Sequence, residues 1–159
     1  MLLHLLRHAH AGDPAIWEGP DDVRPLSDKG RAQAERLGKF LARVGFRADA
    51  IVASPKRRAL ETAEIVAEHL GIEVTVDDRL AGALDIAVLE AVLDALGGPE
   101  RPVLVGHDPD FSELLGTLCA AEIPMRKGAL ARVEIGSSLR PGAGVLRWLV
   151  PPDLLKPEG

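Results

Sequence analysis

Four side chains that could do chemistry together follow apolar runs of the chain. Arg7 and His8 come directly after one such run, His107 follows another, and Arg58 lies a few residues beyond a third. Short apolar runs bounded by turn-forming residues are typical of buried strands. Ligands of open α/β sheets bind beyond the carboxyl ends of the strands. We therefore expect two imidazoles and at least two guanidiniums to meet at one edge of a sheet.

No matching cluster of carboxylates is apparent beside these cations, so the site is expected to bind an anion. Arginine side chains bind tetrahedral oxyanions through paired hydrogen bonds, which makes phosphate the leading candidate. A neutral imidazole is a competent nucleophile towards phosphorus when cations neutralise the phosphoryl oxygens. The residues therefore predict phosphoryl transfer to one histidine, stabilised by the other histidine and the arginines, without a metal.

A zinc site is the main alternative function for the histidines near the N-terminus. His8 and His10 are two residues apart and would face the same way on a continuing strand, with His4 further back. No cysteine or acidic ligand accompanies them at metal-binding spacing, and Arg7 would repel the cation. We therefore predict that no metal is bound and that His10 lines the rim of the pocket.

Strands and helices alternate along the chain that must position these groups. Strands are expected over residues 1–6, 49–53, 72–76, 102–106, 129–135 and 145–150, and helices over residues 28–44, 55–70, 86–96 and 109–120. Ser27 suits the N-cap of the first helix, and apolar residues three and four apart give this helix one buried face. Residues 77–84 are expected to form a loop, and the tail after Pro151 to pack loosely.

The alternation predicts an α/β fold, a three-layer α/β/α sandwich around a mostly parallel sheet. The last two strands are joined by a Gly- and Pro-rich turn and are expected to place an antiparallel strand near the C-terminus. With 159 residues and no linker or internal repeat, the chain is expected to form a single domain over residues 1–159.

The composition of the chain limits its possible binding partners and its possible location in the cell. The chain is 47% hydrophobic and 27% charged with a net charge of -5, which indicates a globular protein and disfavours nucleic acid or an anionic membrane as the partner. No apolar run approaches the roughly 20 residues of a membrane span. The single cysteine, Cys119, cannot form an internal disulfide, which favours the cytoplasm. A monomer or a small homo-oligomer is expected.

Four segments, in chain order, resemble motifs of the histidine phosphatase (phosphoglycerate mutase-like) superfamily. Residues 6–9 read Leu-Arg-His-Ala, close to the family's Arg-His-Gly, and residues 54–63 match its Ser-Pro-x-x-Arg-Ala-x-x-Thr-Ala pattern. Residues 105–107 match its second histidine motif, and residues 24–30 resemble the stretch that leads into its first helix. The short chain and the Arg-His-Ala variant look most like the SixA-type branch, the short phosphohistidine phosphatases.

The resemblance implies a role for each matching residue. His8 would be the nucleophile that is transiently phosphorylated, and Arg7 and Arg58 would clamp the phosphoryl oxygens. His107 would be the second histidine of the phosphate pocket. Arg57 does not fall at the position of the motif arginine and is interpreted as a flanking charge. No cofactor is expected.

One part of the family pattern is missing. Many relatives supply a glutamate general acid from the loop after the third strand, whereas residues 77–85 contain no glutamate, so that Asp85 or Asp78 would have to substitute. General acid catalysis is typically worth about 10²- to 10⁴-fold. An imidazole leaves a phosphoramidate far more readily than an alkoxide leaves an ester, so a missing acid favours phosphohistidine, carried by a protein, as the substrate.

Two other functions stay open from the sequence. The chain could be a small-molecule phosphomonoesterase of the same superfamily, or a non-catalytic module that binds phosphohistidine or phosphate. The intact nucleophile position disfavours the second. Asp108 and Asp110, which follow His107, are expected to cap the next helix rather than to orient a histidine or to serve as the proton donor.

Overall fold

A six-stranded sheet in the order β3-β2-β4-β1-β5-β6 forms the centre of the molecule. The computed structural model describes residues 1–157. The strands are β1 (Leu2–Arg7), β2 (Ala50–Ala53), β3 (Val74–Val76), β4 (Pro102–Gly106), β5 (Leu130–Ile135) and β6 (Gly144–Val150). Strands β3, β2, β4 and β1 run parallel, and β5 pairs antiparallel with both β1 and β6. The predicted fold class is confirmed, including the antiparallel strand near the C-terminus.

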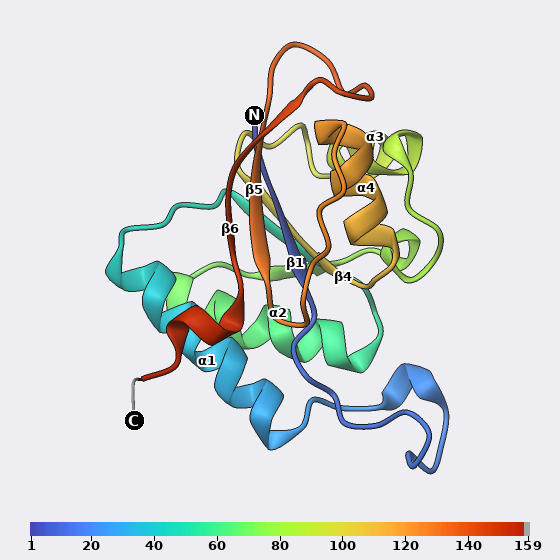
Figure 1. The fold of residues 1–159 in the computed structure, drawn as a ribbon, viewed down its shortest axis with the longest axis vertical. Coiled ribbons are helices and arrows are strands. Elements are labelled where there is room, and N and C mark those ends of the chain that lie inside the picture. Colours follow the sequence, from blue (N-terminus) through green and yellow to red (C-terminus); the bar gives the residue numbers. More distant parts are fainter. Residues whose placement is uncertain (158–159) are drawn as a thin grey trace.

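Four helices cover the two faces of this sheet (Figure 1). They are α1 (Asp28–Arg43), α2 (Arg57–Leu70), α3 (Ile86–Ala95) and α4 (Asp110–Cys119). Apolar residues of α1 and α2 pack on one face, and apolar residues of α3 and α4 pack on the other. Among residues 1–157, no helix combines the length and the apolar character needed to cross a bilayer.

The alternation of side chains along the strands explains why both faces are covered. Leu3 and Leu5 of β1 belong to the core under α3 and α4, whereas Leu6 belongs to the core under α1 and α2. All three are fully buried. Successive side chains of a strand point to opposite faces, so a strand that is apolar at nearly every position needs a layer on each side.

Helix ends follow the local signals of the sequence. The Ser27 hydroxyl accepts a hydrogen bond from the N–H of Gly30 at 3.1 Å and caps α1, as predicted. At the end of α2, Gly71 adopts a φ of 67°, a left-handed conformation that glycine reaches without steric cost.

Three local predictions differ from the structure. Helix α2 begins at Arg57, two residues later than expected, because the N–H of Lys56 donates to the Ser54 hydroxyl in a bend. Strand β3 is shorter because the N–H of Ile72 still donates to a carbonyl of α2. The predicted loop 77–84 contains a short 3-10 helix, Asp78–Ala81.

The expectation of a loosely packed tail is wrong for the 3-10 helix Pro152–Leu155. Pro152 is buried, and Leu155 packs against the core under α1 and α2. Two apolar side chains thus anchor the segment. The charged residues and prolines around them led to the wrong prediction of a loosely packed tail. Residues 158 and 159 of the predicted tail lie outside the described residues.

Candidate active site

The two histidines singled out in the sequence lie side by side at the carboxyl end of the sheet. In the register of β1 and β4, Arg7 pairs with Gly106, so His8 and His107 leave the sheet together. Their ring centroids are 5.3 Å apart with an interplanar angle of 55°. His8 is 6% exposed and His107 is 8% exposed. The parallel pairing of β1 with β4 therefore brings together residues that are far apart in the chain.

Hydrogen bonds fix the orientation and the protonation state of His8. Its Nδ1 lies 2.8 Å from the carbonyl oxygen of Ala9, and since a carbonyl only accepts, Nδ1 carries the proton. The Nε2 atom is left with a free lone pair. Burial, followed by the charges of His107, Arg58 and Arg7, lowers the pKa of His8 to about 3. The ring is therefore neutral near pH 7.

Thr62 holds the segment after His8 in place. The N–H of Ala9 donates to the Thr62 hydroxyl at 3.1 Å, and this hydroxyl donates to the carbonyl of Arg58 at 2.7 Å. The side chain of Thr62 is fully buried on α2. Thr62 therefore ties the backbone beside His8 to the helical turn that carries Arg58.

Arg58 is braced by a carboxylate that the sequence analysis missed. It donates to the carbonyl oxygen of Asp21 at 2.9 Å and to its carboxylate at 3.0 Å. The Asp21 carboxylate also accepts from Arg24 at 3.2 Å. Although burial acts to raise it, the hydrogen bond from Arg24 and the charge of Arg58 lower the pKa of Asp21 below its ordinary value. The carboxylate thus stays ionised and fixes the guanidinium.

A second carboxylate, Asp108, lies beside Arg7. The Arg7 guanidinium donates to the carbonyl of Met125 at 2.6 Å and lies 3.5 Å from the Asp108 carboxylate. Asp108 also accepts from the N–H of Ser112 at 3.1 Å and from its hydroxyl at 2.6 Å. The predicted capping role of Asp108 is thus seen together with an ion pair. The expectation that no carboxylates lie beside the cations is wrong, because Asp21 reaches the site from the 3-10 helix Asp21–Val23 and Asp108 from the turn before α4.

His107 is held through a buried serine. Its Nε2 lies 2.8 Å from the hydroxyl of Ser54, which is fully buried and also accepts from the N–H of Lys56 at 3.2 Å. Burial, followed by the charges of Arg58 and Lys56, lowers the pKa of His107 to about 4. His107 is therefore neutral near pH 7, like its neighbour His8.

Three nitrogen atoms of this cluster are buried without a hydrogen-bond partner in the described part of the chain. They are Nε of Arg7, Nε of Arg58 and Nδ1 of His107. A buried donor without a partner is costly, and such groups in folded proteins usually point to a missing ligand or to water. The cluster is therefore suited to a compact acceptor such as a tetrahedral oxyanion.

His10 lies against the start of α1 instead of beside His8. Its Nδ1 is 2.6 Å from the Ser27 hydroxyl, and its N–H donates to the side chain of Gln33 at 2.9 Å. A Cβ atom at Gly30 would lie 1.9 Å from the carbonyl oxygen of His10. The serine and the glycine of the motif in residues 24–30 thus let α1 approach the loop that follows the nucleophile.

The two candidate proton donors lie on the connection between β3 and α3. Asp85 is the N-cap of α3, and its carboxylate accepts from the N–H of Val88 at 2.9 Å. Asp78 begins the 3-10 helix that precedes it. No group of three or more histidine, cysteine or acidic side chains within residues 1–157 is arranged to hold a metal ion.

Lys127 is a further cation near the site that the sequence analysis did not identify. The next residue, Gly128, donates its N–H to the carbonyls of Arg7 and His8 at 3.1 and 3.0 Å. Burial, followed by the charges of Arg7 and Arg24, lowers the pKa of Lys127. No motif marks this residue, because only the pairing of β5 with β1 brings it to the end of β1.

Comparisons of the sequence with those of known proteins show which proteins this chain resembles. The sequence pattern of the histidine phosphatase superfamily (branch 1) matches residues 3–83. The phosphohistidine phosphatase SixA of Escherichia coli (strain K12) is 28% identical over 162 residues, covering 98% of this chain and 97% of that protein. An uncharacterised protein of Picosynechococcus is 35% identical over 116 residues, covering 71% of this chain and 70% of that protein.

Solved structures show the same fold over almost the whole chain. A structure of the protein histidine phosphatase SixA complexed with tungstate gives a TM-score of 0.82 at 25% identity, covering 98% of this chain and 100% of that one. The putative SixA of Agrobacterium tumefaciens gives a TM-score of 0.75 at 23% identity, covering 94% of this chain and 96% of that one.

Proposed function

The chain belongs to the histidine phosphatase superfamily, and from this membership we propose that it hydrolyses phosphohistidine through a covalent intermediate on Nε2 of His8. The near-full-length similarity to the phosphohistidine phosphatase SixA, together with this membership, supports phosphatase activity. The observation that carries the finer proposal is the set of three unpartnered nitrogens around a neutral imidazole. These donors can bind phosphoryl oxygens while the imidazole attacks.

The first step forms a bond between Nε2 of His8 and phosphorus. The substrate imidazole carries a proton on its other ring nitrogen beforehand, so when its bond to phosphorus breaks the electron pair leaves with a neutral imidazole. His8 is ready for this attack because its proton is held on Nδ1 by the carbonyl of Ala9. In the second step, water attacks the phosphorus of phospho-His8, the electron pair of the broken bond returns to Nε2, the water releases a proton to solvent, and phosphate departs.

Arg7, Arg58 and His107 stabilise the charge that spreads over the phosphoryl oxygens. The carboxylates of Asp21 and Asp108 fix the two guanidiniums before the substrate binds, which reduces reorganisation during the reaction. The Ser54 hydroxyl, which accepts from Lys56, donates to Nε2 of His107 and keeps a proton on Nδ1. This set of donors neutralises the charge in the transition state without a metal.

The choice of phosphohistidine rests on the leaving group. The carboxylate of Asp85 is engaged in capping α3, and no glutamate is present in residues 77–85. A site with a weak proton donor favours an imidazole leaving group over an alkoxide. The similarity to the phosphohistidine phosphatase SixA points to the same substrate. The tungstate complex of a SixA protein supports an oxyanion pocket here.

The phosphohistidine is proposed to be carried by a protein. The cytoplasm is proposed as the location because the chain has one cysteine, Cys119, and it is unpaired. The state of assembly, a monomer or a small homo-oligomer, stays a prediction.

The test compares kcat/KM on a phosphohistidine peptide with kcat/KM on a panel of alkyl and aryl phosphates. Phosphohistidine is expected to be the best substrate, and ³²P from it is expected to label the protein in an acid-labile form. His8→Ala is expected to abolish both the label and the turnover. His69→Ala, a change near the end of α2 where the ring contacts Glu35 of α1 rather than the candidate site, is the control and is expected to keep both.

Two results would overturn parts of the proposal. A clear preference for an alkyl phosphate would contradict the substrate and favour a small-molecule phosphomonoesterase. An acid-stable label, or a strict need for a divalent metal, would contradict the phosphohistidine mechanism. Phosphate binding without turnover in the unmodified protein would indicate a binding module.

A further inference from the structure

A groove of about 710 Å³ lies on the face of the sheet beside α1, and it shares no residue with the candidate active site. It includes Leu2, the first residue of β1, and Arg101, the residue before β4. His8 and His107 follow the other ends of these two strands. Since a strand rises by about 3.3 Å per residue, the cationic end of the groove lies roughly 20 Å from the nucleophile.

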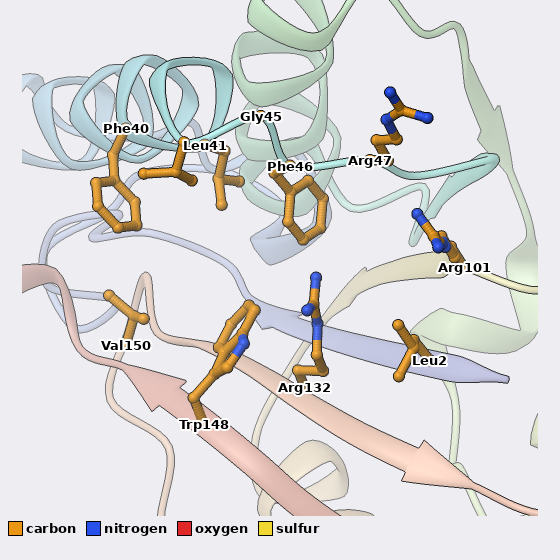
Figure 2. Close-up of a pocket in the computed structure, with 11 residues that line it drawn as sticks. Leu2, Phe40, Leu41, Gly45, Phe46, Arg47, Arg101, Arg132, Trp148 and Val150 are labelled. Carbon is orange, nitrogen blue, oxygen red and sulfur yellow. The ribbon is translucent and has the colours of Figure 1, made fainter.

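The walls of this groove, called the aromatic groove below, differ from one end to the other. Figure 2 shows Phe40, Trp148 and Val150 at one end, and Arg47 and Arg101 at the other. The first end offers flat apolar surfaces and the second offers positive charge. A volume of this size falls within the range of roughly 300–1,000 Å³ that is typical of small-molecule sites.

Arg132 lies between the two ends and is held rigidly. Its guanidinium carbon is 4.7 Å from the ring centroid of Trp148 and 5.5 Å from that of Phe46. Its Nε donates to Nε2 of His4 at 2.9 Å, while Nδ1 of His4 donates to the carbonyl of Pro102 at 2.9 Å. A buried neutral histidine therefore orients the guanidinium and leaves its outer nitrogens available to a ligand.

The arginines of the groove form no ion pair in the described part of the chain, although the carboxylate of Asp49 lies near their end and accepts from the backbone N–H groups of Glu100 and Arg101. Among the ion pairs of residues 1–157, none involves Arg47, Arg101 or Arg132. The chain as a whole has a net charge of -5, so three unpaired arginines around one apolar hollow form a local exception. Arginines in such a position bind phosphate or carboxylate groups in a bidentate manner.

We propose that the aromatic groove is a second ligand site, which binds a nucleoside phosphate. The flat base would lie against Phe40 and Trp148, because aromatic faces attract flat rings. The phosphates would lie among Arg47, Arg101 and Arg132, because three guanidiniums match more than the one negative charge that a carboxylate carries. This site is independent of the phosphatase reaction proposed above.

Because Trp148 lies in the groove, its fluorescence gives a direct readout of ligand binding there. The chain has two tryptophans, and Trp17 lies on the loop before α1, outside the groove. In a Trp17→Phe protein, AMP, ADP and ATP are expected to quench the fluorescence of Trp148 saturably, and isothermal titration calorimetry is expected to give the same affinity. The quenching is expected to persist in an Arg58→Ala variant, which weakens the phosphate pocket of the candidate active site and leaves the groove unchanged.

A matched pair of double variants tests the role of the arginines. Arg47→Gln with Arg101→Gln removes two exposed charges of the groove and is expected to weaken nucleotide binding at least about tenfold. Arg79→Gln with Arg147→Gln removes two exposed charges that pair with carboxylates elsewhere. This control is expected to retain the affinity within about twofold, since both double variants change the net charge equally.

Several outcomes would overturn the proposal. One is the absence of saturable quenching by any of the three nucleotides up to about 1 mM. Loss of nucleotide binding in an Arg58→Ala variant would place the nucleotide in the active site. Equal losses of nucleotide affinity in the two double variants would show that the net charge of the protein, and not the groove, attracts the nucleotide. Quenching by an acidic aromatic peptide but by no nucleotide would identify a protein-binding groove instead.

Discussion

The candidate active site and the aromatic groove both gather arginines, but they hold them differently. At the candidate active site, Arg7 and Arg58 lie against the carboxylates of Asp108 and Asp21. In the groove, Arg132 lies against aromatic rings and a neutral histidine. A carboxylate fixes a guanidinium and offsets part of its charge, whereas aromatic packing fixes it and leaves the charge in place. The first arrangement suits a transient anion in a reaction, and the second suits retention of a ligand.

Two buried histidines of the same segment sharpen the contrast. His4 uses both ring nitrogens within the structure, one towards Pro102 and one towards Arg132. His8 uses only Nδ1, towards the carbonyl of Ala9, and keeps Nε2 free. Both rings are buried and have a lowered pKa. The free Nε2 therefore separates His8, the proposed nucleophile, from His4, whose two ring nitrogens are both engaged.

The largest expected effect is a difference in phosphatase activity between variants of the two arginine clusters. Arg58→Ala is expected to lower kcat/KM on phosphohistidine by about 10²- to 10³-fold, because it removes donors from the developing phosphoryl charge. Arg132→Ala is the counterpart in the groove and is expected to change kcat/KM less than about threefold. Steady-state kinetics of the two purified variants checks this, and similar losses in both would contradict the separation.

The next effect concerns the stability of both regions in acid. Burial lowers the pKa of His8 to about 3 and those of His4 and His107 to about 4. In the unfolded chain these rings take up protons near pH 6.5, so the unfolded state binds more protons and stability falls as the pH drops below 6.5. Between pH 7 and pH 5 the loss is on the order of 1–2 kcal/mol for each histidine.

Thermal unfolding between pH 7 and pH 5 measures this loss in a range where carboxylates titrate little. The melting temperature of the unmodified protein is expected to fall by several degrees. His8→Gln removes one of the three buried imidazoles and is expected to give a shallower dependence on pH. A melting temperature that stays constant over this range would show that the rings are not held neutral.

A smaller effect tests the brace on Arg58. Asp21→Asn retains the size of the side chain and removes its charge, so the guanidinium keeps only weaker hydrogen bonds. We expect kcat/KM to fall by about tenfold, mostly through kcat, because Arg58 is positioned less accurately. Asp153→Asn, which loses an exposed ion pair with Arg126, is the control and is expected to leave the kinetics unchanged. An unaffected Asp21→Asn variant would show that the brace is dispensable.

The smallest effect is expected from the two candidate proton donors. Asp78→Ala and Asp85→Ala are each expected to lower kcat/KM on phosphohistidine by less than about threefold, because the departing imidazole has little need of an acid. The kcat/KM values of the same two variants on an aryl phosphate show how the effect depends on the leaving group. A loss of about 10²-fold on phosphohistidine in either variant would identify that residue as the general acid.

The sequence by itself determined the elements and the main residues that meet at their ends. The apolar runs predicted the strands, and the cap at Ser27 and the glycine at position 71 set helix ends, because these signals act within a few residues. Parallel pairing then required His8 and His107 to leave the sheet at the same edge. Local periodicity was therefore enough to predict the fold class and the meeting of the two imidazoles.

Only the tertiary structure decided what surrounds these residues. Asp21 reaches Arg58 across 37 positions of the chain, and Lys127 reaches the site only because β5 pairs with β1. The aromatic groove likewise joins α1, β5 and β6, whose sequences carry no shared motif. Contacts of this kind depend on how whole elements pack, and no pattern of neighbouring residues encodes that packing. The same packing holds Ala9, whose N–H donates to Thr62 on α2 and whose carbonyl engages Nδ1 of His8, and this leaves Nε2 of His8 free.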